Sequence, residues 1–157
     1  MQVVVFSDYQ CPYCRALDDR LSRIREDYGR QVAVVYRHFP LGGHTASRPA
    51  AVAAECAARQ GRFWALHGSL FAQQDSIGRK SWTRFAEEAE VPDLEAFTAC
   101  VAREAPARAV TRDSTAAREL GARGTPTFLI NDRLYGGAIP MDALKSEVER
   151  TLEGDRL

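Results

Sequence analysis

The sequence lacks the features that would mark a membrane-spanning, nucleic-acid-binding or disordered protein. No apolar run approaches the roughly 18 residues that a transmembrane helix needs. Basic residues number 21 and acidic residues also number 21, which leaves no net charge to attract nucleic acid. With 45% apolar and 27% charged residues, the composition is that of an ordinary globular protein. The 157 residues therefore fit one domain, or one domain that carries an insertion.

The N-terminus also lacks the pattern of a secretory signal. It reads Met-Gln-Val-Val-Val-Phe, without a basic segment, a long apolar segment or a small-residue cleavage site. We therefore expect either a cytoplasmic protein or the mature or trimmed form of an exported one.

Hydrophobic periodicity at the start of the chain predicts a strand, a helix and a second strand. Two short apolar runs rich in β-branched residues, 2–6 and 31–37, are the predicted strands. Between them, apolar residues recur at helical spacing from Leu17 to Tyr28. This order is typical of a βαβ unit.

The rest of the chain predicts a helical block, a hairpin and a final helix. The block is followed by predicted strands at residues 127–130 and 133–135. Because neither half beside the block is large enough to fold alone, we interpret the block as an insertion into an α/β domain. We predict one domain from residues 1–41 and 123–157, and an all-helical insertion from residues 42–122.

Cysteine is scarce, and two of the four cysteines form a Cys-x-x-Cys pair. Cys11 and Cys14 fall between the first predicted strand and helix, with Pro12 suited to the first helical turn. A cysteine at this position lies beside unpaired N–H groups and the positive end of the helix dipole, which stabilise a thiolate. We therefore predict that Cys11 is an exposed nucleophile, with the Tyr13 phenol nearby. Cys14, one turn later, is predicted to resolve the mixed disulfide formed on Cys11.

Two other interpretations of the pair stay open, although redox activity is the one we favour. A Cys-x-x-Cys pair can be half of a structural zinc site, but such a site needs four ligands in paired spacing. Cys56 and Cys100 form no second pair, and the three histidines form no His-x3–5-His motif. We interpret the histidines as structural residues and expect no metal. The second alternative is an inert structural disulfide in this turn.

A second motif precedes the third predicted strand. In Gly124-Thr125-Pro126-Thr127-Phe128, a proline follows a helix and a glycine and comes directly before a strand. This makes Pro126 a candidate for a cis peptide bond, although only about 5–6% of X-Pro bonds in folded proteins are cis. The prediction of a cis bond at Pro126 becomes specific when this motif is considered together with the cysteine pair in the earlier βαβ unit.

These motifs make the chain resemble the DsbA-like thiol–disulfide oxidoreductases, which have a thioredoxin-like fold. The resemblance covers nearly the whole chain. It is carried by Phe6-Ser7-Asp8-Tyr9-Gln10-Cys11-Pro12-Tyr13-Cys14, Tyr36-Arg37-His38-Phe39-Pro40-Leu41, residues 53–57, residues 63–71 and residues 124–128.

The resemblance implies thiol–disulfide exchange on reduced or unfolded protein substrates, with donation of the Cys11–Cys14 disulfide as the favoured direction. It implies that Pro126 is a cis-proline and that Thr125 offers backbone hydrogen bonds to an extended substrate. Together with Pro12 and Tyr13, these two residues would form the substrate-binding set. No metal, organic cofactor or nucleic acid is implied. An oxidase of this kind would have a membrane reoxidase of the DsbB or VKOR type as partner and a periplasmic or otherwise extracytoplasmic location.

Two departures from the family pattern bear on these expectations. Val5 stands six residues before Cys11, where thioredoxin-fold enzymes commonly carry a buried carboxylate. We therefore expect slower deprotonation of Cys14, or a relay through water or Asp8. The usual strand before the first strand of such domains is also missing from this sequence.

Three alternative functions stay open. Thr125 is the residue type seen in isomerase-type and reductase-type relatives, so shuffling or reduction of disulfides is one of them. Cys-Pro-Tyr-Cys is also typical of glutaredoxins, which are glutathione-dependent reductases but lack the helical insertion. A peptide-binding module without exchange activity is the non-enzyme alternative.

The remaining cysteines and the tyrosines near the pair complete the candidate site. Cys56 and Cys100 fall on predicted helices and are either two buried thiols or a disulfide between those helices. Some relatives carry a second disulfide in this region, and the resemblance favours the bond. We expect Tyr9, Tyr13 and the loop before Pro126 to line a peptide groove, because they flank the two sulfur atoms.

Overall fold

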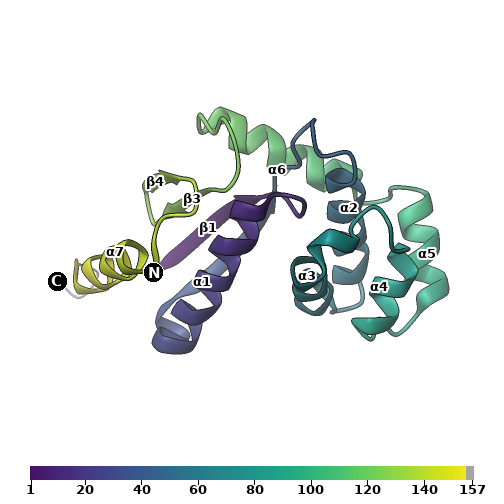
Figure 1. Cartoon of the computed structure of the whole chain (residues 1–157), viewed down its shortest axis with the longest axis horizontal. Coiled ribbons are helices and arrows are strands. Elements are labelled where there is room, and N and C mark those ends of the chain that lie inside the picture. The colour runs from purple at the N-terminus through teal and green to yellow at the C-terminus, as the bar shows by residue number, and fades with distance from the viewer. Residues whose placement is uncertain (155–157) are drawn as a thin grey trace.

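The computed structural model describes residues 1–154 and contains a four-stranded mixed sheet. The strands lie in the order β2-β1-β3-β4 (Figure 1), with β1 parallel to β2, β3 antiparallel to β1 and β4 antiparallel to β3. The predicted strands are confirmed, and each predicted end lies within two residues of the observed one. Their bounds are β1 Gln2–Ser7, β2 Ala33–His38, β3 Thr127–Ile130 and β4 Arg133–Gly136.

Helices occupy the positions that the periodicity predicts, and the predicted α/β class with a helical block between a βαβ and a ββα unit is confirmed. Ser81 and Asp93 are N-cap residues, and each accepts a hydrogen bond from the backbone N–H group three residues later. The bounds are α1 Pro12–Tyr28, η1 Gly29–Gln31, α2 Ser47–Ala58, α3 Phe63–Ala72, η2 Gln74–Ser76, α4 Trp82–Glu88, α5 Leu94–Ala102, α6 Ala107–Glu119 and α7 Met141–Gly154.

The sheet is covered on both faces, which explains why residues 3–6 of β1 are all apolar rather than alternating. Val3 and Val5 of β1 share one core with apolar residues of α1 and α7. Phe6 points to the other face, where it packs with Phe39 and with Ala117 of α6. Because both faces of β1 are buried, the loop at its C-terminal end is held in a fixed position at the start of α1.

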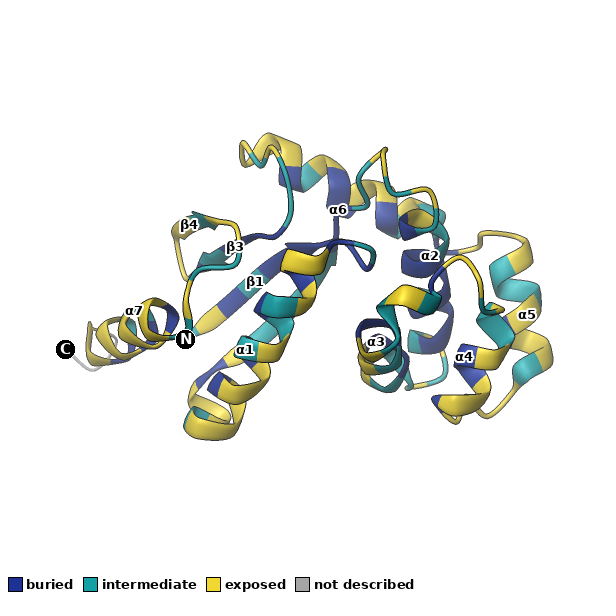
Figure 2. Ribbon diagram, viewed as in Figure 1, coloured by how far each residue is buried: buried dark blue, intermediate teal, exposed yellow. Residues whose placement is uncertain are grey.

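The helical block has a core of its own around α2. This helix is rich in alanine, and its small side chains let α3 and α5 pack directly against it. Figure 2 shows α2 largely buried, while the outer faces of α4 and α5 are exposed. The block lies beside the sheet, on the side where the cysteine pair begins α1 (Figure 1).

The domain boundaries at residues 42 and 122 stay a prediction. Within the predicted insertion, α6 packs against β1 and β2 as well as against α2. The end of the predicted first domain, residues 155–157, lies outside the described residues. Among the helices between residues 1 and 154, none has the length and apolar character needed to cross a membrane.

Candidate active site

Cys11 is the N-cap residue of α1, directly after the loop that leaves β1. Its backbone is extended, and its carbonyl oxygen accepts hydrogen bonds from the N–H groups of Cys14 (3.1 Å) and Arg15 (3.2 Å). Pro12 occupies the first helical position, where its missing N–H leaves no donor unsatisfied. Both cysteines of the pair are free thiols in this structure.

The surroundings of the pair shift the pKa values of its two thiols in opposite directions. The pKa of Cys11 is lowered from 9.0 to about 5, chiefly by a hydrogen bond from the Cys14 thiol, with further contributions from the Thr125 hydroxyl and the N–H groups of Cys14 and Tyr13. Burial opposes this shift. The pKa of Cys14 is raised far above its ordinary value, first by burial and then by its bond to Cys11. Cys11 is thus the thiolate at neutral pH, and Cys14 keeps its proton.

The expectation that Cys11 is exposed is wrong, because the side chain is only 4% exposed. The loop before β3 folds over it, and its sulfur lies 3.5 Å from the carbonyl oxygen of Thr125. The Thr125–Pro126 segment is thus the part of this loop that contacts the sulfur. The peptide bond between these two residues is cis.

Two cavities flank the cysteine pair. One of about 370 Å³ is bordered by Thr125 and Pro126 together with Arg123, Leu134 and Tyr135. It lies beside the cis bond.

The other cavity measures about 520 Å³ and is bordered by Pro12 and by polar side chains that include Gln10, Gln74 and Arg79. Of the predicted substrate-binding residues, Thr125 and Pro126 therefore border the first cavity and Pro12 borders the second, while Tyr13 borders neither. Tyr13 stands 66% exposed on the first turn of α1.

Gln74 is a residue of the site that sequence reasoning missed. Its amide nitrogen donates to the backbone oxygens of Tyr9 (2.8 Å) and Cys11 (2.9 Å), which ties η2 of the helical block to the loop before the pair. No local signal marks this glutamine, because the contact joins segments more than 60 residues apart.

Asp8 is a fully buried carboxylate that fixes the same loop. It accepts hydrogen bonds from the N–H groups of Gln10 (2.8 Å) and Leu41 (2.8 Å), from His44 Nδ1 (2.9 Å) and from the hydroxyl of Ser47. Its own N–H lies 3.4 Å from the Cys14 sulfur. The carboxylate therefore holds three segments in place around the pair.

The expectation that Tyr9 lines a peptide groove is wrong. Its side chain is 1% exposed, and its hydroxyl lies 3.0 Å from His67 Nδ1. His67 Nε2 lies 2.9 Å from a carboxylate oxygen of Asp18. Tyr9 thus belongs to a buried polar cluster between the sheet and the helical block, and His67 joins α3 to α1.

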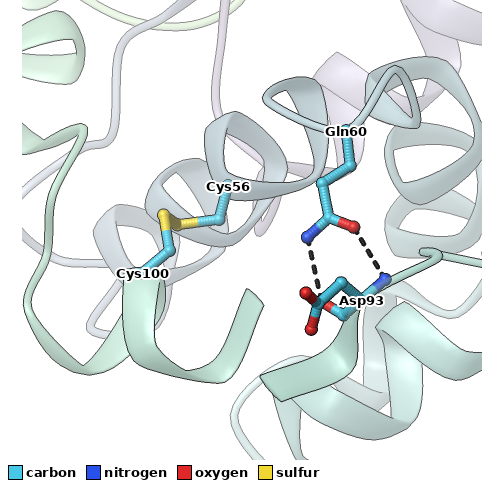
Figure 3. Close-up of a disulfide and its surroundings, with 4 residues drawn as sticks. All are labelled: Cys56, Gln60, Asp93 and Cys100. Carbon is cyan, nitrogen blue, oxygen red and sulfur yellow. Dashed lines mark hydrogen bonds between the residues drawn. A yellow bond between two sulfur atoms is a disulfide. The ribbon is translucent and has the colours of Figure 1, made fainter. Parts of the chain in front are cut away.

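The other two cysteines form a disulfide between α2 and α5. Figure 3 shows the Cys56–Cys100 bond and, beside it, the side chain of Gln60, which pairs with both the N–H (2.8 Å) and the C=O (2.9 Å) of Asp93. The disulfide and this pair of hydrogen bonds fasten α5 to α2. In the described part of the chain, no group of three or more histidine, cysteine or acidic side chains is placed to hold a metal ion.

A family model described as thioredoxin matches residues 1–150. A Na⁺/H⁺ antiporter of Salinispora tropica is 36% identical over 156 residues, which cover 99% of this chain and 24% of that protein. The chain spans about a quarter of the length of the curated relatives it matches.

Solved structures share the fold over most of their length. A periplasmic thioredoxin-like protein from Salmonella enterica serovar Typhimurium is 30% identical, with a TM-score of 0.71 and coverage of 97% of this chain and 84% of that one. The thiol-disulfide exchange protein α-DsbA2 from Wolbachia pipientis is 22% identical and shows likeness of fold, with a TM-score of 0.83 and coverage of 96% and 81%.

Proposed function

The chain belongs to the thioredoxin-fold family of DsbA-like thiol–disulfide oxidoreductases, and from that premise we propose that it oxidises protein substrates by exchanging the Cys11–Cys14 disulfide with their cysteines. Thiol–disulfide oxidoreductase activity in general is supported by the family. The protein substrate and the oxidising direction are our proposal.

The proposed reaction proceeds through one mixed disulfide. A substrate thiolate attacks the sulfur of Cys11, the Cys11–Cys14 bond breaks, and Cys14 leaves and takes up a proton. A second substrate thiolate then attacks the substrate sulfur of the mixed disulfide, and Cys11 leaves as a thiolate. The substrate gains a disulfide, and the protein ends with both cysteines reduced.

The position of Cys11 as the N-cap of α1, which contributes to its lowered pKa, is the observation that supports the oxidising direction. At pH 7, the shift of the Cys11 pKa from 9.0 to about 5 stabilises the reduced pair by about 2.7 kcal/mol, because pH 7 lies two units above the lowered pKa. Cys14 adds nothing, since it stays protonated. For a two-electron couple this energy corresponds to a potential about 60 mV more oxidising than that of a pair with ordinary thiols. A low pKa also makes Cys11 a good leaving group in the second step.

Substrate binding is proposed for the segment that covers Cys11. The carbonyl of Thr125 lies at the sulfur of Cys11, and the cavity beside Pro126 gives room for an extended chain. We propose that the substrate pairs with the backbone here, and that Tyr13 and Pro12 contact it on the other side of the sulfur.

We propose an extracytoplasmic location and reoxidation by a membrane protein of the DsbB or VKOR type. The location is supported by the periplasmic relative and by the Cys56–Cys100 disulfide, since such bonds persist in oxidising compartments. The Salinispora relative is named for ion transport, but it is about four times as long as the segment that matches this chain. We therefore do not propose ion transport for this chain.

Equilibration of the cysteine pair with glutathione buffers tests the direction. We expect a potential more oxidising than the roughly −270 mV of thioredoxin. A value at or below that of thioredoxin would overturn the oxidase and leave a reductase. An insulin-reduction assay and a scrambled-substrate assay on the same sample separate exchange activity from peptide binding alone.

A further inference from the structure

The cavity beside Pro12 adjoins a further cavity on the side of the helical block, and Thr45 borders both of them. The further cavity measures about 300 Å³ and lies between the loop at residues 40–45, the start of α2 and one face of α6. The two helices contact each other, and Figure 1 shows α6 beside the start of α2. Because Pro12 follows Cys11 directly in the chain, the two cavities together reach from the cysteine pair to α6.

The further cavity is basic, although the chain as a whole carries no net charge. Arg48 of α2, Arg118 of α6 and the imidazole of His44 border it, and no acidic residue among those described does so. We call it the arginine cavity. The cavity beside Pro12 is balanced instead, since one arginine and one aspartate, Arg79 and Asp75, both border it. The excess of positive charge therefore belongs to the arginine cavity.

In the described part of the chain, neither arginine of the arginine cavity has a carboxylate partner. Arg48 donates through Nη2 to the Thr111 hydroxyl (3.0 Å) and to the carbonyl oxygen of Ala107 (3.5 Å). The guanidinium of Arg118 lies over the ring of Phe39, 5.7 Å from its centre. A guanidinium has five N–H donors in a planar fork that matches a carboxylate. Both side chains therefore keep donors for an acidic ligand.

The acidic residues of α6 and of the cysteine loop do not line the arginine cavity. On α6, Asp113 pairs with Arg37 (3.3 Å), and Glu119 does not border the cavity. Asp8 of the cysteine loop is fully buried, and its oxygens already accept four hydrogen bonds, one of them from His44. The first turn of α2 contains no acidic residue, so the positive end of the helix dipole adds to the field of the arginines.

We propose that the arginine cavity binds acidic side chains of the protein substrate, so that the protein selects cysteines that lie in an acidic segment. The inference rests on the proposed function, because it names the substrate class of the same site. While a substrate cysteine reacts at Cys11, the chain to one side of it passes Pro12 and Thr45, and its carboxylates form ion pairs with Arg48 and Arg118. These ion pairs take no part in the exchange of sulfur atoms. They attract the acidic segment and hold its cysteine near the reactive sulfur.

Three reduced peptides with the same two-cysteine centre test the proposal. The first carries a run of glutamates before the cysteines, the second carries the run after them, and the third has glutamine at all of these positions. The oxidised protein is mixed with each peptide, and the rate of peptide oxidation is measured by acid quench and chromatography at low salt and at about 1 M salt, where charges are screened beyond about 3 Å. The rate of each peptide with hydroxyethyl disulfide, a neutral disulfide, corrects for the reactivity of its own thiols.

Three variants separate the arginine cavity from the charge of the protein as a whole. Arg48→Gln combined with Arg118→Gln removes both charges of the cavity, and both side chains are exposed, so the fold does not depend on them. Arg48→Lys combined with Arg118→Lys keeps the charges. Arg108→Gln is the matched control, because Arg108 is an exposed arginine of α6 that does not border the cavity.

At low salt, we expect the parent to oxidise one of the two glutamate peptides about fivefold or more faster than the glutamine peptide, which is the effect of two exposed ion pairs. One orientation should be favoured, because the arginine cavity lies on one side of the cysteine pair. The preference should disappear in about 1 M salt and in the double glutamine variant. It should persist in the double lysine variant and in Arg108→Gln.

Three results would overturn the proposal while exchange itself stands. They are a preference within twofold in the parent, an equal preference for both glutamate peptides, and a preference that survives in the double glutamine variant or is lost equally in Arg108→Gln. A parent protein that oxidises none of the three peptides and does not reduce insulin would overturn the proposed function, and the substrate preference with it.

Discussion

The hydrogen bond from Cys14 to Cys11 makes a quantitative prediction about the reactivity of the pair. It is the largest of the effects that lower the pKa of Cys11 to about 5. A hydrogen bond to a charged group contributes about 1.5–3 kcal/mol, and one pKa unit corresponds to about 1.4 kcal/mol. Cys14→Ala removes this donor and should therefore raise the pKa of Cys11 by about one to two units. The N–H groups at the start of α1 and the Thr125 hydroxyl should hold the rest of the shift.

The rate of alkylation by iodoacetamide between pH 4 and pH 9 measures this pKa, because the thiolate is the reactive form. The Cys56–Cys100 disulfide leaves Cys11 and Cys14 as the free thiols of the described residues, and mass spectrometry locates the label. Cys14→Ser is the matched control, since a hydroxyl in place of the thiol still donates to Cys11. It should keep the midpoint closer to that of the parent than Cys14→Ala does.

Two results would refute this reasoning. A midpoint in the parent close to the ordinary 9.0 would mean that the start of α1 and the neighbouring thiol do not stabilise the thiolate. A midpoint that stays the same in Cys14→Ala would mean that the backbone amides hold the charge alone.

Three further predictions follow from the same structure. The pKa of Cys11 is lower in the folded reduced protein than in the unfolded chain, so its contribution to stability is present at high pH and is lost as the pH falls through about 5. The unfolding free energy of the reduced form, measured with guanidinium against the oxidised form, should fall by about 2.7 kcal/mol between pH 7 and pH 4, and a constant difference would contradict the assignment. Replacing both Cys56 and Cys100 with alanine should lower the unfolding free energy by about 4 kcal/mol, because the bond closes a loop of 44 residues, while the alkylation of Cys11 should keep its rate. Tyr13→Ala should slow oxidation of a reduced, unfolded protein more than reaction with a small thiol, and an equal effect on both would remove Tyr13 from the proposed groove.

The parts of the fold and site that the sequence predicted are those governed by local rules. A β-branched run followed by proline and helical spacing identifies the turn that presents Cys11, since strand propensity and the first helical turn each depend on a few neighbouring residues. The caps at Ser81 and Asp93 were predictable for the same reason. Asn131 adopts a left-handed backbone conformation in the turn between β3 and β4, which is a local preference of asparagine as well.

The errors concern burial and contacts between distant segments. Cys11 was expected to be exposed because it stands at a helix start, and Tyr9 was expected to line a groove because it flanks the sulfur atoms. The loop before β3 covers Cys11, and His67 of α3 contacts Tyr9. The contact of Gln74 with the cysteine loop was missed because the two segments meet only when the helical block docks beside the sheet.

The sequence alone determined the order of elements, the position of the cysteine pair at the start of a helix and the position of Pro126 before a strand, because each depends on periodicity and short spacing. Only the tertiary structure decided that Cys14 is the main donor to Cys11, that Cys11 is covered, and that Tyr9 and His67 connect the interior to Asp18. The physical reason is that periodicity and short spacing depend on neighbouring residues, whereas burial and the contacts of Thr125 and His67 arise only where segments far apart in the chain meet.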